Sequence, residues 1–158
     1  MQHGHKITTE RQETLTKKKL KIIGWREWVQ LPDLFENKIK AKIDTGARTS
    51  SLHAFDLKKE NIEGIEYVSF KVHPEQRSTT KTHLCRIQIL EYRKIKSSNG
   101  QSELRPVILT HLNLLGETWP IELTLTNRDE MGFRMLLGRE SFRKRFLVDA
   151  GASYYGKK

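Results

Sequence analysis

The sequence has no long apolar run and only one cysteine in 158 residues. None of its segments approaches the roughly 18 consecutive apolar residues that a membrane helix needs, and the polar N-terminus lacks the apolar stretch of a signal peptide. The single cysteine, Cys85, excludes an intrachain disulfide, which fits a reducing compartment. We therefore expect a soluble, cytoplasmic protein.

Aromatic residues are also scarce, at 8%, and the sequence contains no glycine-aromatic ribonucleoprotein pattern, cysteine-histidine finger or basic leucine zipper. A dedicated nucleic-acid module therefore has no motif to support it. What the chain has in excess is positive charge, because 29 Lys and Arg residues outnumber 19 Asp and Glu residues, for a net charge of +10. This balance favours a polyanionic partner such as nucleic acid, an anionic surface or an acidic protein.

Motifs for metals and nucleotides are missing as well. The six histidines and one cysteine form no His-Glu-x-x-His and no Cys-x-x-Cys, and there is no Gly-x-x-x-x-Gly-Lys loop. His83 and Cys85 share one face of a predicted strand, but Ile87 and Ile89 lie on that face too, which favours a core histidine and a buried thiol. We predict no metal ligand and no cofactor, so any ATP dependence would belong to a partner.

The chain is long enough for one domain that buries about two-thirds of its unfolded surface. Residues 1–18 are polar and have no apolar period, so we expect a flexible arm there and one folded domain over residues 19–158. Asn99-Gly100 lies between two strand-like runs, which predicts a hairpin from Tyr92 to Val107. Alternating apolar residues predict strands in residues 20–29 with a bend at Gly24, and in residues 39–43, 68–72, 85–92, 107–111, 119–125 and 146–149, with short helical segments in residues 50–54 and 140–145. This pattern is typical of an all-β fold, a small closed structure with one short C-terminal helix.

The stretch from Lys38 to Ala54 combines a strand pattern with possible chemistry. Ile39, Ala41 and Ile43 alternate with lysines, which is the period of a half-buried strand, and that strand leads directly into Asp44-Thr45-Gly46. A carboxylate on a tight turn at a strand end is held rigidly. The same three residue types also form ordinary turns, so the triplet by itself leaves both interpretations open.

A second sequence motif bears on the choice between an ordinary turn and a catalytic loop. Met135-Leu136-Leu137-Gly138-Arg139 is a short apolar run followed by Gly-Arg, and together with Asp44-Thr45-Gly46 it resembles the retropepsin-like aspartic peptidases. In that family such a segment packs beneath the Asp-Thr-Gly loop, and a hairpin forms a flap over the substrate. The resemblance implies an acid-protease barrel. It extends over residues 25–149, where the chain is similar to a bacterial family often labelled ATP-dependent zinc proteases, some of whose members are associated with ATP-grasp ligases that add glutamates to a ribosomal protein.

The resemblance implies that Asp44 is the catalytic residue and that Thr45, Gly46 and Ala47 support its loop. Aspartic peptidases need two carboxylates that share one proton, and this chain has one Asp-Thr-Gly. Asp149-Ala150-Gly151 lacks the hydroxyl that braces the partner loop in the family, so an Asp44/Asp149 pair is the weaker interpretation. We expect a homodimer in which Asp44 meets its symmetry copy.

The residues expected to bind substrate are Arg48, Arg139, Asn99 and Gly100. The best-known retropepsins have an acidic residue at the position of Arg48, where it pairs with the arginine of the Gly-Arg segment. Here Arg48 and Arg139 would make a basic lip unless Glu140 neutralises them, so we predict an acidic, glutamate-rich protein substrate and a functional link to a glutamate ligase. The alternative is a non-catalytic binding module of the same fold for an acidic protein or RNA, which would tolerate the loss of Asp44.

Overall fold

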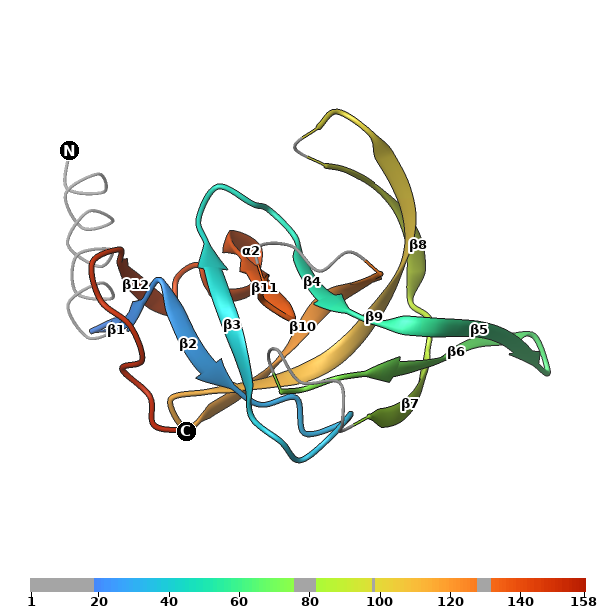
Figure 1. Ribbon diagram of the computed structural model, residues 1–158, viewed down its shortest axis with the longest axis horizontal. Coiled ribbons are helices and arrows are strands. Elements are labelled where there is room, and N and C mark those ends of the chain that lie inside the picture. Colours follow the sequence, from blue (N-terminus) through green and yellow to red (C-terminus); the bar gives the residue numbers. More distant parts are fainter. Residues whose placement is uncertain (1–18, 76–81, 98, 128–131) are drawn as a thin grey trace, which may run out of the picture.

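The computed structural model describes residues 19–75, 82–97, 99–127 and 132–158, which form three β-sheets (Figure 1). The largest sheet has seven strands in the order β2 (Arg26–Val29), β3 (Ile39–Asp44), β11 (Met135–Gly138), β4 (Ser50–His53), β10 (Glu117–Thr126), β9 (Ser102–Leu114) and β8 (Glu91–Lys96). A second sheet contains β5 (Phe55–Ile62), β6 (Ile65–Val72) and β7 (His83–Gln88), and a third pairs β1 (Lys21–Gly24) in parallel with β12 (Phe146–Asp149). Within the described ranges there is one helix, the short α2 (Arg139–Phe142). The prediction of a mainly β, retropepsin-like fold with one short helix is confirmed.

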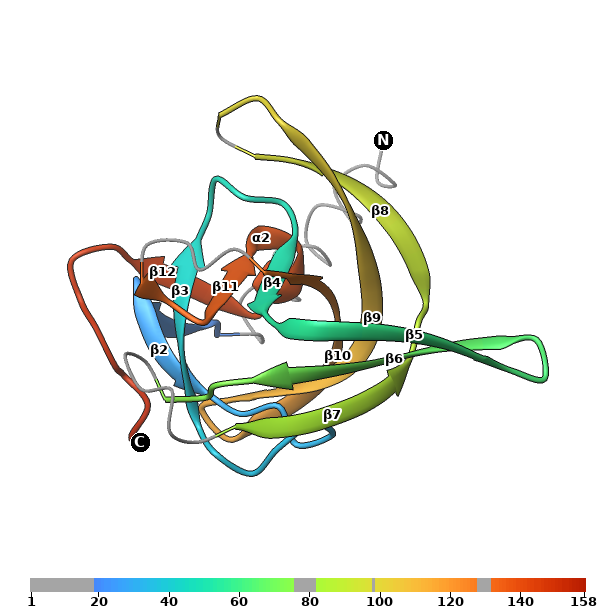
Figure 2. The same cartoon turned by 45° about the vertical axis from the view of Figure 1, so that its right-hand side comes forward.

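The hydrophobic core lies between the large sheet and the three-stranded sheet. The strand that leads to Asp44 turns Ile39, Ala41 and Ile43 inward, as its alternation predicts, and the lysines between them are only partly buried. From the three-stranded sheet, Phe70 and Cys85 pack into the same core. Figures 1 and 2 show the β5–β6 hairpin extending away from the body of the molecule, while the β8–β9 hairpin arches over the side on which β3 ends.

A buried carboxylate fixes the C-terminal segment along β2. Glu27 is fully buried and accepts hydrogen bonds from the backbone N–H groups of Gly24, Tyr155 and Gly156, at 2.7, 2.9 and 3.0 Å. A side chain at Gly24 would clash, because its Cβ would lie 2.3 Å from the carbonyl oxygen of Ala152. The edge strand β2, which pairs with β3, is therefore bound to the C-terminal segment on its outer side. Among the described residues, no helix is long and apolar enough to cross a membrane.

Some sequence-based boundaries are wrong. Residues 50–54 do not form a helical turn, because Ser50–His53 is the strand β4, which pairs with both β10 and β11. The strand expected from Cys85 through Tyr92 is two strands in different sheets, β7 and β8. The strand Phe55–Ile62 was not predicted, and the helix predicted over residues 140–145 is the shorter Arg139–Phe142. The predicted arm, residues 1–18, lies outside the described residues.

Candidate active site

Asp44 is the last residue of β3, and its carboxylate is held by the turn that follows it. Its Oδ1 accepts hydrogen bonds from the backbone N–H groups of Gly46 at 2.9 Å and Ala47 at 3.1 Å. The side chain is half-buried, whereas Thr45 and Gly46 are exposed. Both bonds orient the carboxylate, and the role of Gly46 and Ala47 as supports of a catalytic loop stays a prediction.

The Gly-Arg segment packs beneath this loop, as the resemblance implies. Gly138 lies opposite Asp44 in the parallel pairing of β11 with β3. A Cβ at Gly138 would come within 2.6 Å of the carbonyl carbon and oxygen of Thr49, so only glycine allows this approach. The backbone N–H of Gly138 donates to Oγ of the buried Ser50 at 3.1 Å. Two segments far apart in the sequence are thereby locked together under the Asp44 loop.

Arg139 supports the loop from the same side. Its backbone N–H donates to the carbonyl oxygen of Ala47 at 2.7 Å, and its Nη1 donates to the carbonyl oxygen of Gly46 at 3.2 Å. Arg139 is not among the residues that line the cleft described below. The contacts in the structure are therefore those of a residue that braces the loop, and its predicted contact with substrate stays a prediction.

A cleft of about 1150 Å³ lies beside Asp44. Its walls come from the Asp44 loop, β8, the middle of β9, the start of β10, and α2 with the residues that follow it. The basic residues that line it are Arg48, Arg93, Lys94, Lys96, Arg105, Arg143 and Arg145, and the acidic residues are Asp44, Glu91, Glu122 and Glu140. The cleft therefore has more cationic than anionic side chains along its walls.

Arg48 lines this cleft and is exposed. The alternative in which Arg48 pairs with Glu140 is not found, because the ion pair of Glu140 is with Arg143, at 3.2 Å. Within the part of the chain that the structure describes, Arg48 forms no ion pair. Its charge is available to a ligand.

The predicted hairpin is formed by β8 and β9, and Asn99 and Gly100 lie at its tip. The loop is closed by backbone hydrogen bonds from Ser97 to Gln101 and from Gly100 to Ser97, and Oδ1 of Asn99 accepts from the N–H of Gln101 at 3.0 Å. Gly100 has a φ of 86°, which suits glycine. Asn99 and Gly100 shape the tip of the hairpin and do not line the cleft, so their predicted contact with substrate stays a prediction.

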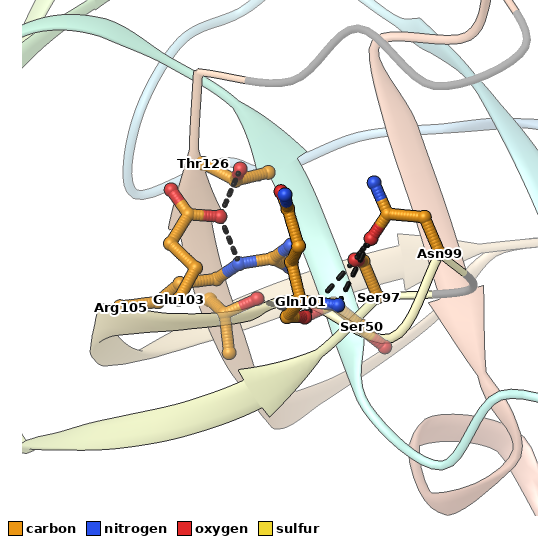
Figure 3. A network of polar contacts seen from close by, with 8 residues as sticks. Ser50, Ser97, Asn99, Gln101, Glu103, Arg105 and Thr126 are labelled. Atoms are coloured by element: carbon orange, nitrogen blue, oxygen red, sulfur yellow. Dashed lines mark hydrogen bonds and ion pairs between the residues drawn. The ribbon is translucent and has the colours of Figure 1, made fainter.

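Behind this tip lies a polar network that sequence reasoning missed (Figure 3). Arg105 is only 4% exposed, and its Nε donates to Glu103 at 3.0 Å, while Oγ1 of Thr126 donates to the same carboxylate oxygen at 3.2 Å. Directly across the β8–β9 pairing, Arg93 forms ion pairs with Glu91 and, at 3.3 Å, with Glu122. Two arginines opposite each other would repel, so these carboxylates stabilise the base of the hairpin.

Asp44 is the cleft carboxylate that has no cationic partner among the described residues, since Glu91, Glu122 and Glu140 are all engaged by arginines. Asp149 does not supply a second one. It lies on β12 in a different sheet and outside the cleft, where its carboxylate accepts from the N–H of Gly151 at 3.0 Å and from the Tyr155 hydroxyl at 3.1 Å. An Asp44/Asp149 pair is therefore not present in this chain.

The side chains of the described residues do not form a donor set that fits a zinc ion. Among the described residues, no three His, Cys, Asp or Glu side chains gather where they could hold a metal. Cys85 faces the core, and its Sγ lies 3.7 Å from the carbonyl oxygen of Leu34. Burial raises the pKa of this thiol to about 11, which disfavours the thiolate that zinc requires. The ring of His83 packs against Phe35.

Comparisons with known proteins agree with this geometry. The family model described as "Retropepsin-like aspartic endopeptidase RimB" matches residues 22–158. Two curated relatives, both called "Probable alpha-L-glutamate ligase", are 49% identical in Shewanella pealeana and 47% identical in Parasynechococcus marenigrum, over 133 residues each. Each match covers 84% of this chain but only 29% and 28% of the relative, so the chain spans less than a third of the length of these relatives.

A solved structure is also similar. The crystal structure of a protein of unknown function from Legionella pneumophila matches with a TM-score of 0.69 and 28% identity. The match covers 87% of this chain and 98% of the Legionella chain. The arrangement of strands described above is therefore shared over nearly the whole of that protein.

Proposed function

Because the chain belongs to the RimB-like family of retropepsin-like aspartic endopeptidases, we propose that it hydrolyses amide bonds with Asp44 as its catalytic carboxylate. The observation that carries the proposal is the Asp44 loop. A half-buried carboxylate, oriented by two backbone N–H groups, opens into a cleft and has no cationic partner among the described residues. A carboxylate in this setting is free to exchange a proton with water or substrate.

The reaction requires a second carboxylate, and we infer that a second copy of the chain supplies it. In an aspartic dyad one aspartate stays charged and takes a proton from the attacking water, while the other is protonated and donates to the carbonyl oxygen of the scissile amide. The two protonation steps belong to the pair. Each chain has one Asp-Thr-Gly, and Asp149 lies elsewhere, so a two-fold axis beside Asp44 completes the dyad.

The exposed Thr45 supports this arrangement. Its hydroxyl has no hydrogen-bond partner within the described part of the chain, although it sits directly after Asp44. A two-fold axis beside the loop would let each Thr45 hydroxyl bond to the loop of the other copy. The dimer would then also hold the two Asp44 carboxylates at a fixed separation.

We infer that the substrate is acidic. The cleft has more cations than anions, and Arg48 is unpaired among the described residues. The relatives named as probable glutamate ligases include a segment similar to this chain, which supports a functional link between this domain and a glutamate ligase. Guanidinium groups bind carboxylates bidentately, so a glutamate-rich chain complements the cleft in charge.

The experiment that tests catalysis replaces Asp44 by Asn. Asn keeps the size of the side chain and cannot cycle a proton, so hydrolysis of a glutamate-rich peptide should stop while thermal unfolding is unchanged. Full hydrolysis by the folded Asp44→Asn variant would contradict the proposed mechanism. The net charge of +10 is equally compatible with the alternative of a non-catalytic module for an acidic protein or RNA. That alternative requires a wild-type protein that binds such ligands and cleaves none.

A further inference from the structure

Trp119 and Arg145 form a contact at the wall of the cleft that neither the sequence nor the family assignment identifies. Trp119 lies near the start of β10, is 6% exposed, and donates its Nε1–H to the carbonyl oxygen of Ser141 at 2.9 Å. Cζ of Arg145 lies 4.5 Å from the centroid of the Trp119 ring. The backbone N–H of Arg145 is also bonded to the carbonyl oxygen of Phe142, at 3.0 Å. The arginine is thus held at its backbone and at its head group.

The stacked guanidinium keeps its hydrogen-bond donors. A guanidinium whose Cζ lies over an aromatic ring uses none of its hydrogen-bond donors in that contact. In the described part of the chain, Arg145 forms no ion pair and no side-chain hydrogen bond. Its side chain is exposed and lines the cleft. A planar fork with free donors, fixed in place by an aromatic ring, is prepared to accept a carboxylate.

The residues around Arg145 leave this end of the cleft positive. Arg143 is compensated by Glu140, at 3.2 Å. Arg48 lies next to α2, because its carbonyl oxygen accepts from the backbone N–H of Glu140 at 3.3 Å, and no carboxylate among the described residues pairs with its side chain. Arg48 and Arg145 therefore both lack a counter-ion here, and Arg145 is the one whose head group is already ordered.

We propose that Arg145, positioned by Trp119, binds a carboxylate side chain of the substrate and sets the preference for acidic sequences. This inference rests on the proposed function, since it assigns a subsite in the same cleft. The ligand is a glutamate or aspartate side chain in an extended peptide. Arg145 contacts the substrate, and Trp119 acts through Arg145 as a positioning residue.

The test compares Arg145→Gln with Arg145→Lys and with a control one residue away. Lys144→Gln removes the same unit of charge, and Lys144 is exposed and does not line the cleft. Each variant is assayed on a glutamate-rich peptide and on the same peptide with its glutamates replaced by glutamine. We expect Arg145→Gln to lower the ratio of kcat/KM for the acidic peptide to that for the neutral one about tenfold, mainly through KM. Arg145→Lys should lose part of the ratio, because the ammonium keeps the charge without the fork. Lys144→Gln should stay within about twofold of wild type, because a surface charge outside the cleft is screened.

The result that overturns the inference is an unchanged ratio in Arg145→Gln. If Arg145 only covers the ring of Trp119, its replacement will lower the thermal unfolding temperature and slow both peptides equally. An equal fall in the ratio with Lys144→Gln also overturns it, because the effect would then follow net charge.

A binding measurement separates this inference from the proposed catalysis. The variant Asp44→Asn is titrated with the labelled glutamate-rich peptide, alone and combined with Arg145→Gln or Lys144→Gln. We expect about tenfold weaker binding with Arg145→Gln only. This result supports the subsite even if the wild-type protein cleaves no peptide. Equal binding by all three proteins, or none by any of them, overturns the subsite even if Asp44 proves catalytic.

Discussion

Gly138 lies directly opposite Asp44 in the parallel pairing of β11 with β3, and a Cβ on Gly138 would come within 2.6 Å of the Thr49 carbonyl group. We expect Gly138→Ala to push the Asp44 loop out of position, with a loss of about 1 to 3 kcal/mol in the free energy of unfolding and at least a tenfold loss in kcat/KM. Denaturant unfolding and peptide hydrolysis measure the two effects.

The control for this variant is Gly64→Ala. Gly64 has a φ of 84° in the β5–β6 turn, so alanine is strained there and should lower stability by about 1 kcal/mol. The turn lies away from the cleft, so kcat/KM should be unchanged. Equal activity losses in the two variants would mean that general destabilisation, and not the Gly138 contact, accounts for the effect.

Arg48 should select acidic substrates, because its charge has no counter-ion among the described residues and Glu140 pairs with Arg143. We expect Arg48→Glu to erase or reverse the preference for glutamate-rich over neutral peptides and to spare slow cleavage of neutral ones. Charge-assisted contacts of this kind contribute about 1.5 to 3 kcal/mol, which corresponds to roughly tenfold to hundredfold discrimination.

The ratio of kcat/KM for the two peptides, measured at low and high salt, checks the role of Arg48. In the wild type the preference should weaken as salt rises. A variant that cleaves both peptides equally poorly and is also less stable would show that Arg48 has a structural role instead.

The strand before Asp44 could be anticipated from a local signal, whereas the packing of the Gly-Arg segment beneath its loop was implied by the family resemblance. Period-two alternation decides which residues of β3 are buried, and the two short motifs carry the resemblance. The β8–β9 hairpin followed from Asn99-Gly100 between two alternating runs. The strand and the hairpin are each encoded within a few neighbouring residues.

Other parts depend on contacts between segments far apart in the sequence, which periodicity does not reveal. Ser50–His53 has few apolar residues, and it is a strand because β10 and β11 flank it on both sides. The position of Arg145 on Trp119 depends on α2 lying against the start of β10. The buried Arg105 is neutralised by Glu103, whose carboxylate also accepts a hydrogen bond from Thr126 at the end of β10.

Cys85 should make stability depend on alkaline pH. Burial raises the pKa of its thiol from 9.0 to about 11, so between these values the unfolded chain loses a proton that the folded chain keeps. The free energy of unfolding should therefore be fully retained below about pH 9 and fall by about 1 to 2 kcal/mol as the pH approaches 11.

Thermal unfolding of wild type and Cys85→Ala across this range measures the contribution of the thiol. The variant is expected to be less stable at neutral pH, because it leaves a cavity, but to lose less stability on going to high pH. Parallel curves for the two proteins would show that the thiol does not contribute to the alkaline loss.

Specific activity should fall on dilution, because a dimer that carries one Asp44 per chain dissociates into inactive monomers. The fall should follow the dissociation constant obtained from sedimentation over the same concentrations. Activity per chain that stays constant well below that dissociation constant would indicate a site complete within one chain.

The most direct test of the shared site mixes wild-type chains with Asp44→Asn chains at constant total concentration and measures hydrolysis after the subunits have exchanged. If both copies of Asp44 are needed, activity should follow the square of the wild-type fraction, so that an equal mixture keeps about one quarter of the activity of the pure wild type. A linear decrease, with about one half remaining, would contradict a dyad formed by two copies of Asp44.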